Sequence, residues 1–306
     1  MNPSCGTTPS CGTTPSGGEP KDVVSSEGYH YALEAEELTC SPVHFLTFES
    51  PTVVETGLPK VHAQTPKPVI VLDSDETIGS WGDLSLLYSY FWTVLRKAPC
   101  PTRFVEIAKA TGVVRPHLAE LLTSLLSMKA EGDVGAIVLM TAAPNCYGWV
   151  SFLVRVLEVW LDLGKGALFD LVLAKEQILA WNKEKSIFWR PEEGIPKDMH
   201  QVKAGLGLAP DTPTLMVEDR PHLVLHADRL LQVPPYNVAV DLVGVAETFL
   251  DKEEWSETLA LTWRVTFSET WDIFCRHPHH FTDTAADVAL KSQVKTVKDT
   301  VKTLCT

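Results

Sequence analysis

The sequence predicts an α/β protein with a central parallel β-sheet that is covered by helices on both faces. Two observations lead to this prediction. Short and almost continuous apolar runs recur along the chain, and segments with helical apolar spacing separate them. Strands without polar alternation are typical of parallel sheets buried on both faces, and alternation with helices is typical of α/β proteins. In such sheets ligands bind beyond the carboxyl ends of the strands.

The elements follow from these runs and from the helical spacing between them. The expected strands are Val69–Leu72, Ala136–Met140, Leu168–Leu173, Thr214–Val217 and Val238–Leu242. The expected helices are Leu84–Lys97, Thr102–Ala110, Pro116–Lys129, Trp149–Leu163 and Leu223–Leu231.

Composition sets limits on the class of protein. The chain has 306 residues, of which 45% are hydrophobic and 21% charged, so a folded core is expected. The net charge of -13 argues against a grip on nucleic acid and against binding to anionic membranes, because both need a basic surface. The most apolar candidate for a membrane span, Leu84 to Leu95, is too short to cross a bilayer. We therefore expect no membrane partner and no nucleic-acid partner.

Cysteine usage and the N-terminus bear on the compartment. The seven cysteines are odd in number, scattered, and form no Cys-x-x-Cys pair, which indicates free thiols in a reducing compartment. The first residues lack the basic start and apolar core of a signal peptide. We expect a cytoplasmic or nuclear protein that is not secreted.

Four parts are expected along the chain. Residues 1–22 are rich in Pro, Gly, Ser and Thr, repeat Pro-Ser-Cys-Gly-Thr-Thr, and predict a disordered low-complexity tail. Residues 23–65 form an N-terminal extension with a possible short strand at His44 to Phe48. Residues 66–252 form the main domain, and residues 253–306 form a C-terminal helical extension.

Two features of the C-terminal extension leave alternatives open. An apolar stripe at helical spacing could pack on the main domain or pair with a partner helix; it consists of Leu290, Val294, Val297, Val301 and Leu304. The segment Arg276 to His280 contains three histidines and could bind zinc, although an exposed loop around Pro278 is the favoured interpretation.

Polar side chains follow three of the expected strands directly. Asp73 and Asp75 come after the first, Thr141 after the second, and the pair Glu218 and Asp219 after the fourth. Each alone has a simple structural role available to it, because Asp and Thr often cap helices or form turns. Their order, each at the end of an apolar run, favours a site.

A phosphate-ester hydrolase needs this set of groups. One carboxylate can attack phosphorus, and a second can protonate the leaving group and then activate water. Asp73 and Asp75 are two residues apart, so both side chains point to one side if the strand stays extended. The remaining carboxylates repel one another unless a cation such as Mg²⁺ lies among them. A hydroxyl and a lysine can hold the phosphoryl oxygens.

These residues resemble the four signature motifs of the haloacid-dehalogenase (HAD) superfamily. The first motif, Asp-x-Asp-x-Thr, is matched by Asp73, Asp75 and Thr77, and the second by Thr141. The fourth, an acidic pair, is matched by Glu218 and Asp219. The resemblance covers about residues 66 to 245. It implies a HAD-like Rossmannoid three-layer sandwich without a large cap domain.

The resemblance also implies roles. Asp73 is the nucleophile, Asp75 is the general acid/base, and Thr77 and Thr141 bind phosphate. Mg²⁺ is the cofactor, held by Asp73, Asp75 through its backbone carbonyl, Glu218 and Asp219. The third motif is a lysine near the start of a helix. Lys197 is preferred, Lys203 lies closer to the fourth motif, and Lys175 reads as a surface residue.

Within the superfamily, Asp-x-Asp-Glu-Thr is similar to the branch of carboxy-terminal-domain phosphatases and NLI-interacting-factor-like proteins. Arg115-Pro116 before a helix and Glu218-Asp219-Arg-Pro agree with that branch. The resemblance implies a protein phosphatase acting on phosphoserine or phosphothreonine, with a phosphoprotein or phosphopeptide as partner. Ser74 replaces an apolar residue and Glu218 replaces an aspartate, so a catalytically weakened interaction module is one alternative. A small-molecule phosphatase is another.

Overall fold

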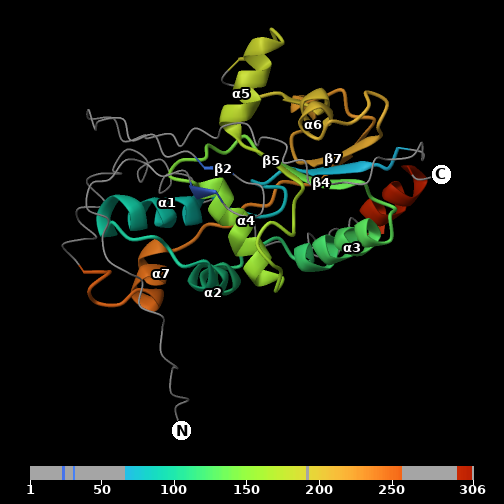
Figure 1. Cartoon of the computed structure of the whole chain (residues 1–306). Helices are drawn as coiled ribbons and strands as arrows, with labels where there is room; N and C mark the ends of the chain where they lie inside the picture. The colour runs from blue at the N-terminus through green and yellow to red at the C-terminus, as the bar shows by residue number, and fades with distance from the viewer. Residues whose placement is uncertain (1–22, 25–29, 32–65, 191–192, 257–294, 305–306) are drawn as a thin grey trace.

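The core of the protein is a five-stranded sheet flanked by helices, as the computed structural model shows (Figure 1). The structure describes residues 23–24, 30–31, 66–190, 193–256 and 295–304. The strands of this sheet are β3 (Val69–Leu72), β4 (Ala136–Met140), β5 (Leu171–Leu173), β7 (Thr214–Glu218) and β9 (Arg229–Gln232). Every neighbouring pair is parallel, so the predicted parallel α/β architecture is confirmed.

The strand order creates a natural site for ligands. The order across the sheet is β5-β4-β3-β7-β9, with β3 in the centre. From β3 the chain adds β4 and β5 on one side and then returns to place β7 and β9 on the other. The order therefore reverses between β3 and β7, and ligands in open α/β sheets bind at such a switch point beyond the carboxyl ends.

Alternate residues of the strands build two separate cores. Ile70 and Leu72 face one core, while Val69 and Val71 face the other, as the two-residue period of a strand requires. Helices on the first face are α1 (Gly82–Tyr90), α2 (Pro101–Thr111), α3 (Leu118–Ala130), α4 (Trp149–Trp160) and α7 (Leu242–Phe249). A π-helical turn, Phe91–Leu95, continues α1.

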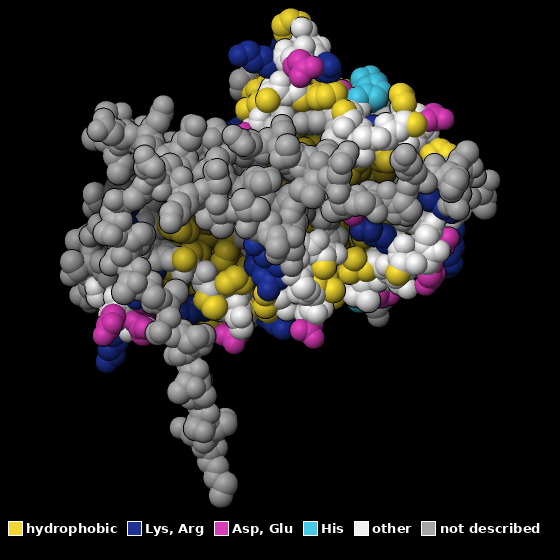
Figure 2. Space-filling view, in the orientation of Figure 1, with side chains coloured by type: hydrophobic (Ala, Val, Ile, Leu, Met, Phe, Trp, Pro, Cys, Tyr) yellow, Lys and Arg dark blue, Asp and Glu magenta, His cyan; other side chains and the backbone are white. Residues whose placement is uncertain are grey.

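The second face has a thinner cover. It is covered by α5 (Lys175–Glu184) and α6 (Met199–Gly205), which contribute buried apolar side chains such as Ile178 and Val202. α5 projects away from the sheet in Figure 1. Figure 2 shows charged and apolar side chains together at its outer end.

Two smaller pairings complete the described structure. β1 (Val23–Val24) and β2 (His30–Tyr31) are antiparallel. β6 (Lys197–Asp198) pairs in parallel with β8 (Val224–Leu225), which follows the 3-10 turn Pro221–Leu223. β6 leads directly into α6, so it fixes the position of the helix start.

Four of the five predicted strands are present, as β3, β4, β5 and β7, and the fifth is not. The strand expected at Leu168 begins at Leu171, because the Asp170 carboxylate accepts a bond from the Ile137 backbone and takes the place of a ladder contact. The strand expected at Val238–Leu242 is wrong: Asp241 caps α7 by accepting from the Gly244 backbone.

The helix expected at Leu223–Leu231 is also wrong. Its last three residues, from Arg229, belong to the edge strand β9, which pairs with β7, and Val224–Leu225 near its start is β8. An edge strand exposes part of its surface, and Leu230 of β9 is 42% exposed. The apolar residues of this segment therefore do not alternate strictly, and their spacing resembles that of a helix. The helix α5 was not expected.

The described part of the C-terminal stripe packs on the first core. Residues 295–304 are helical, and Val297 and Val301 are buried within the first core. Lys298 lies 3.7 Å from Glu120 of α3, and Figure 1 shows the two helices side by side. Leu290, Val294, the histidines at 277–280, the tail 1–22 and His44–Phe48 lie outside the described residues. Among the helices that the structure describes, none is long and apolar enough to cross a membrane.

Candidate active site

The switch point of the sheet brings the first and fourth motifs together. Leu72 pairs with Val217, so the residues that follow each of them are neighbours. The Asp73 backbone N–H donates to the Val217 carbonyl at 3.1 Å. Glu218 is the last residue of β7, and Asp219 follows it. Asp73, Glu218 and Asp219 are all buried.

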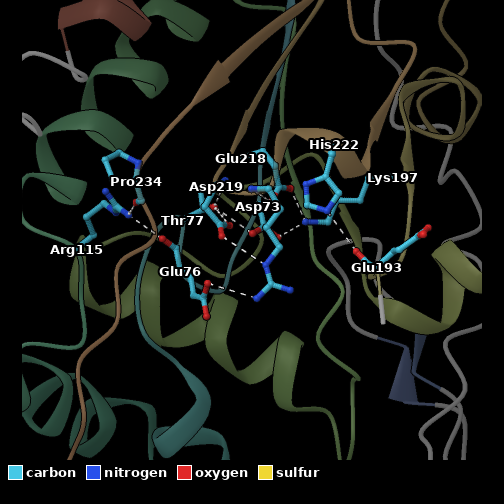
Figure 3. Close-up of polar contacts among 11 residues, drawn as sticks. Asp73, Glu76, Thr77, Arg115, Glu193, Lys197, Glu218, Asp219, His222 and Pro234 are labelled. Atoms are coloured by element: carbon cyan, nitrogen blue, oxygen red, sulfur yellow. Dashed lines mark hydrogen bonds and ion pairs between the residues drawn. The ribbon is translucent and has the colours of Figure 1, made fainter. Parts of the chain in front are cut away.

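Lys197 lies between two of these carboxylates, as Figure 3 shows. Its Nζ is 2.5 Å from Asp73 Oδ1 and 2.6 Å from Glu218 Oε2. The three side chains are at most 5% exposed. Glu218 reaches the lysine with the extra methylene that distinguishes it from aspartate, and its Oε1 accepts from the Arg220 backbone at 3.0 Å.

Thr77 contacts both Asp73, the candidate nucleophile, and Asp219 of the acidic pair. Its Oγ1 is 3.1 Å from Asp73 Oδ2 and 3.0 Å from Asp219 Oδ1, and the single hydroxyl proton can be donated to one of them at a time. The same oxygen accepts from the Asp219 backbone N–H at 3.2 Å. Thr77 therefore positions two carboxylates, a use that the sequence interpretation of it as a phosphate-binding residue did not foresee.

Asp75 and Thr141 form a separate pair beside this cluster. Thr141 Oγ1 donates to Asp75 Oδ2 at 3.4 Å and accepts from the Ala143 backbone at 3.0 Å. Asp75 is half-buried, whereas Asp73 is 4% exposed. The two aspartates of the first motif thus have different partners and different access to solvent.

Burial has the largest effect on the electrostatics of the site, and neighbouring negative charge adds to it. Burial raises the pKa of Asp73 despite the opposing effect of Lys197. Burial and then the Asp73 charge raise the pKa of Asp75 to about 7 and that of Glu218 to about 7. Burial lowers the pKa of Lys197, but the two adjacent carboxylates outweigh it and raise that pKa above its ordinary value. One lysine does not balance this group of acids, and a cation would.

Two arginines support the site. The Arg115 guanidinium donates to the Glu76 carbonyl at 2.7 Å and to the Pro234 carbonyl, and the Glu76 carbonyl also accepts from the Tyr236 backbone at 2.8 Å. Glu76 has a φ of 61°, a conformation that costs energy for a residue with a side chain, so these bonds hold a strained turn of the first motif.

The Arg220 side chain is 54% exposed and lies 3.5 Å from Glu76 and 3.7 Å from Asp219. The sequence pointed to both arginines only as neighbours of motifs. Arg220 contacts its neighbour Asp219, but the contacts of both arginines with Glu76 join groups far apart in the chain, and no local pattern could have indicated those.

The three candidate lysines are now clearly separated. Lys197 is in the cluster. Lys203 donates to the Pro210 carbonyl at 2.8 Å and lies 3.4 Å from Asp228, away from the first motif. Lys175 is the first residue of α5 and is partly exposed.

Three carboxylates are arranged as metal ligands could be. One oxygen each from Asp73, Glu218 and Asp219 lies within 4.8 Å of the others. The Asp75 side chain is not part of this group. A second group with the same limit consists of Asp198, His200 and His226.

Comparisons with known proteins do not identify a family for this chain. No protein-family model and no curated protein sequence matches the chain. Among solved structures, the HAD domain of the effector protein Lem4 from Legionella pneumophila is similar, with 13% identity over 60% of this chain and 94% of that chain. The TM-score is 0.31, so the similarity carries no argument, and the α/β fold rests on the sheet itself.

Proposed function

We propose that this chain is a Mg²⁺-dependent phosphoric monoester hydrolase that acts through an aspartyl-phosphate on Asp73. The convergence of Asp73, Lys197, Glu218 and Asp219 at the switch point carries the proposal. Carboxylates are seldom buried together unless the arrangement serves a charge that arrives with a ligand. The resemblance of the motifs to the HAD superfamily supports the same conclusion.

The residues divide the reaction between them. An oxygen of Asp73 forms a bond to phosphorus while the bond between phosphorus and the ester oxygen breaks, and Asp75 gives its proton to the departing alcohol. Water then attacks phosphorus, gives a proton to Asp75, and releases phosphate and free Asp73. A pKa of about 7 lets Asp75 serve as acid and then as base near neutral pH.

The other groups position the reacting atoms and neutralise the charge on the phosphoryl oxygens. Thr77 holds the Asp73 carboxylate, so the attacking oxygen keeps one orientation. Lys197, already beside Asp73 Oδ1, is placed to hold a phosphoryl oxygen and to offset transition-state charge. The Thr141 hydroxyl, next to Asp75, is available for a second phosphoryl oxygen.

The donor set fits Mg²⁺. The ion prefers oxygen ligands and binds through few carboxylates together with phosphate oxygens. Asp73, Glu218 and Asp219 would hold it, together with the Asp75 backbone carbonyl. When bound, it supplies positive charge that compensates the buried acids and the phosphoryl oxygens.

Phosphoserine or phosphothreonine in a protein is the proposed substrate. A lid domain would be inserted within residues 78–135. These residues form α1, α2 and α3 instead, which pack into the first core. The partly exposed Asp75 is therefore reachable by a phosphorylated side chain on an extended peptide. An exposed arginine at the rim, Arg220, can contact acidic residues that flank the phosphate.

A phosphopeptide-library turnover assay with Mg²⁺ tests this proposal. The comparison is between wild type, Asp73→Asn, and Asp211→Asn as a matched control at an exposed position. We expect phosphate release by wild type and by the control, and none by Asp73→Asn. Equal rates for all three would contradict the proposal, and turnover of small phosphate esters but of no peptide would favour a small-molecule phosphatase.

One observation favours a second candidate, a HAD-like interaction module with weakened catalysis. Glu218 and Asp73 both bind Lys197 closely, so part of the metal-binding and phosphate-binding capacity is used internally. The Ser74 hydroxyl is buried and has no hydrogen-bond partner among the described residues. Absence of any Mg²⁺-dependent turnover in a folded protein would favour this candidate.

A further inference from the structure

A second cluster of ligating side chains lies on the reverse side of the strand that carries Lys197. It consists of Asp198, the last residue of β6, His200 in the first turn of α6, and His226 directly after β8. We propose that these three residues form a zinc site, with a water or an external ligand in the fourth position. The site takes no part in the chemistry proposed for Asp73.

The distances match those between ligands of one zinc ion. His226 Nδ1 is 2.9 Å and His200 Nδ1 is 3.5 Å from Asp198 Oδ1. In a tetrahedral site with bonds of about 2.0 to 2.1 Å, neighbouring ligand atoms are about 3.3 Å apart. The two imidazole rings are stacked, with centroids 4.2 Å apart and planes at 25°. An imidazole nitrogen binds a metal in the plane of its ring, so at least one ring must turn out of the stack before both Nδ1 atoms can bind the same ion. Both side chains are about half exposed, which leaves room for that rotation.

The ligand types favour a transition metal over Mg²⁺ or Ca²⁺. Two imidazole nitrogens and one carboxylate suit Zn²⁺, whereas Mg²⁺ and Ca²⁺ prefer oxygen alone. The two histidine side chains are about half exposed, at 50% and 55%, while the Asp198 side chain is 4% exposed. An ion therefore has an entry path from solvent and an open fourth position. Figure 2 shows histidine at the surface on the side of the molecule that carries α6.

The carboxylate is held in place by a second layer of contacts. Trp181 Nε1 donates to Asp198 Oδ2 at 3.0 Å, and the His200 backbone N–H donates to Oδ1 at 3.0 Å. Orienting bonds of this kind are typical of metal ligands. His226 has a φ of 56°, and its position is set by the pairing of Leu225 with Asp198 across β6 and β8. The backbone thus presents both ligands without a bound ion.

The position of the site has a consequence for Lys197. Successive residues of a strand point to opposite sides, so Lys197 faces the buried carboxylates while Asp198 faces the histidines. A zinc ion that joins β6, β8 and α6 would fix the strand from behind the lysine. We assign it a structural role as a brace for the segment that carries the lysine.

Calorimetric titration of the full chain with Zn²⁺ tests the proposal. Wild type is compared with His226→Gly, which suits the positive φ, and with His200→Ala, which keeps helix propensity. Other histidines and cysteines in the chain provide background binding, so the readout is the difference between variants. We expect one site to be lost, or weakened at least tenfold, in each variant, and a rise in wild-type Tm with Zn²⁺ that both variants lack.

Two control variants separate binding at this site from binding elsewhere in the chain. His222→Ala alters an exposed histidine outside the cluster, and Asp211→Asn alters an exposed carboxylate outside both clusters; both should bind Zn²⁺ as wild type does. Substitution with Co²⁺ should give tetrahedral absorption bands in wild type and in these controls only. Identical Zn²⁺ isotherms for wild type and the folded His226→Gly and His200→Ala variants would overturn the proposal, as would wild-type Co²⁺ spectra without such bands. Because the readout is metal binding and not phosphate release, the zinc proposal can fail or succeed independently of the phosphatase proposal.

Discussion

The short strand β6 separates two charged clusters that differ in almost every physical respect. On one side, Lys197 is enclosed by Asp73 and Glu218, with side chains at most 5% exposed. On the other side, Asp198 meets two histidines that are about half exposed. One cluster holds carboxylates and an ammonium group away from water, and the other offers imidazole nitrogens to it.

The difference shows how burial decides what a cluster can do. Burial raises the pKa values of Asp73 and Glu218, because it disfavours the charged form, so a hard cation that balances the carboxylates becomes favourable. Exposed imidazoles carry no such penalty, and their nitrogen atoms select a softer metal. Chelation, charge removal and side-chain length should therefore affect the two clusters differently.

Removal of divalent cations should have the largest effect. Without Mg²⁺, the acids around Asp73 repel the incoming phosphate, and we expect hydrolysis of an aryl phosphate to fall by about 10³-fold or more. Steady-state rates after treatment with a chelator, then with Mg²⁺ or Zn²⁺ added back, measure this. Recovery of the hydrolysis rate with Zn²⁺ alone would show that the buried cluster does not favour Mg²⁺ over Zn²⁺.

Replacement of the buried lysine should be costly to the fold. Lys197→Met keeps the aliphatic stem but leaves two buried carboxylates without their partner, so we expect a loss of about 3 kcal/mol in the free energy of unfolding. Lys203→Met is the matched control, since that lysine is bonded to a carbonyl and lies near a partly exposed aspartate; about 1 kcal/mol is expected. Denaturant unfolding gives both values, and an equal loss in the two variants would contradict the assignment.

Removal of the proton donor should depend on the leaving group. Asp75→Asn keeps the shape but removes the acid/base function, and we expect about a 10²-fold loss in kcat for a phosphoserine peptide. The loss should be smaller for 4-nitrophenyl phosphate, whose leaving group needs little protonation. A loss of the same size for both substrates would mean that Asp75 has another role.

Shortening the fourth-motif acid should have the smallest effect. Glu218→Asp draws the carboxylate back from Lys197 by one methylene, and we expect the Mg²⁺ concentration for half-maximal rate to change by less than about tenfold. Glu218→Gln, which removes the charge, should raise that concentration further. The reverse order would show that the side-chain length matters more than the charge.

The central fold could be predicted because its strands are buried on both faces. Val69–Leu72 and Ala136–Met140 read as uninterrupted apolar runs, and both strands have those bounds. The edge of the sheet could not be predicted in this way. Arg229 and Gln232 of β9 are exposed and pair only through the backbone with β7. α5 was missed because it projects from the sheet and has few apolar residues.

The site shows the same division. Asp73, Glu218 and Asp219 could be found from sequence because each directly follows or ends a buried strand. The sequence favoured Lys197 but left Lys203 open, because the choice depends on how β6 lies beside β8. Two contacts could not be predicted from local spacing, because each joins residues far apart in the chain. They are the hydrogen bond from Arg115 to the Glu76 carbonyl and the contact between His226 and Asp198.

Calorimetry with Mg²⁺ and beryllofluoride tests the central claim most directly, because the complex imitates a phosphoryl group on an aspartate. We expect tight binding to wild type that requires both Mg²⁺ and beryllofluoride, and no such binding to Asp73→Asn. Equal binding by the two proteins, or no binding by folded wild type, would contradict the claim that Asp73 is a phosphate-accepting nucleophile.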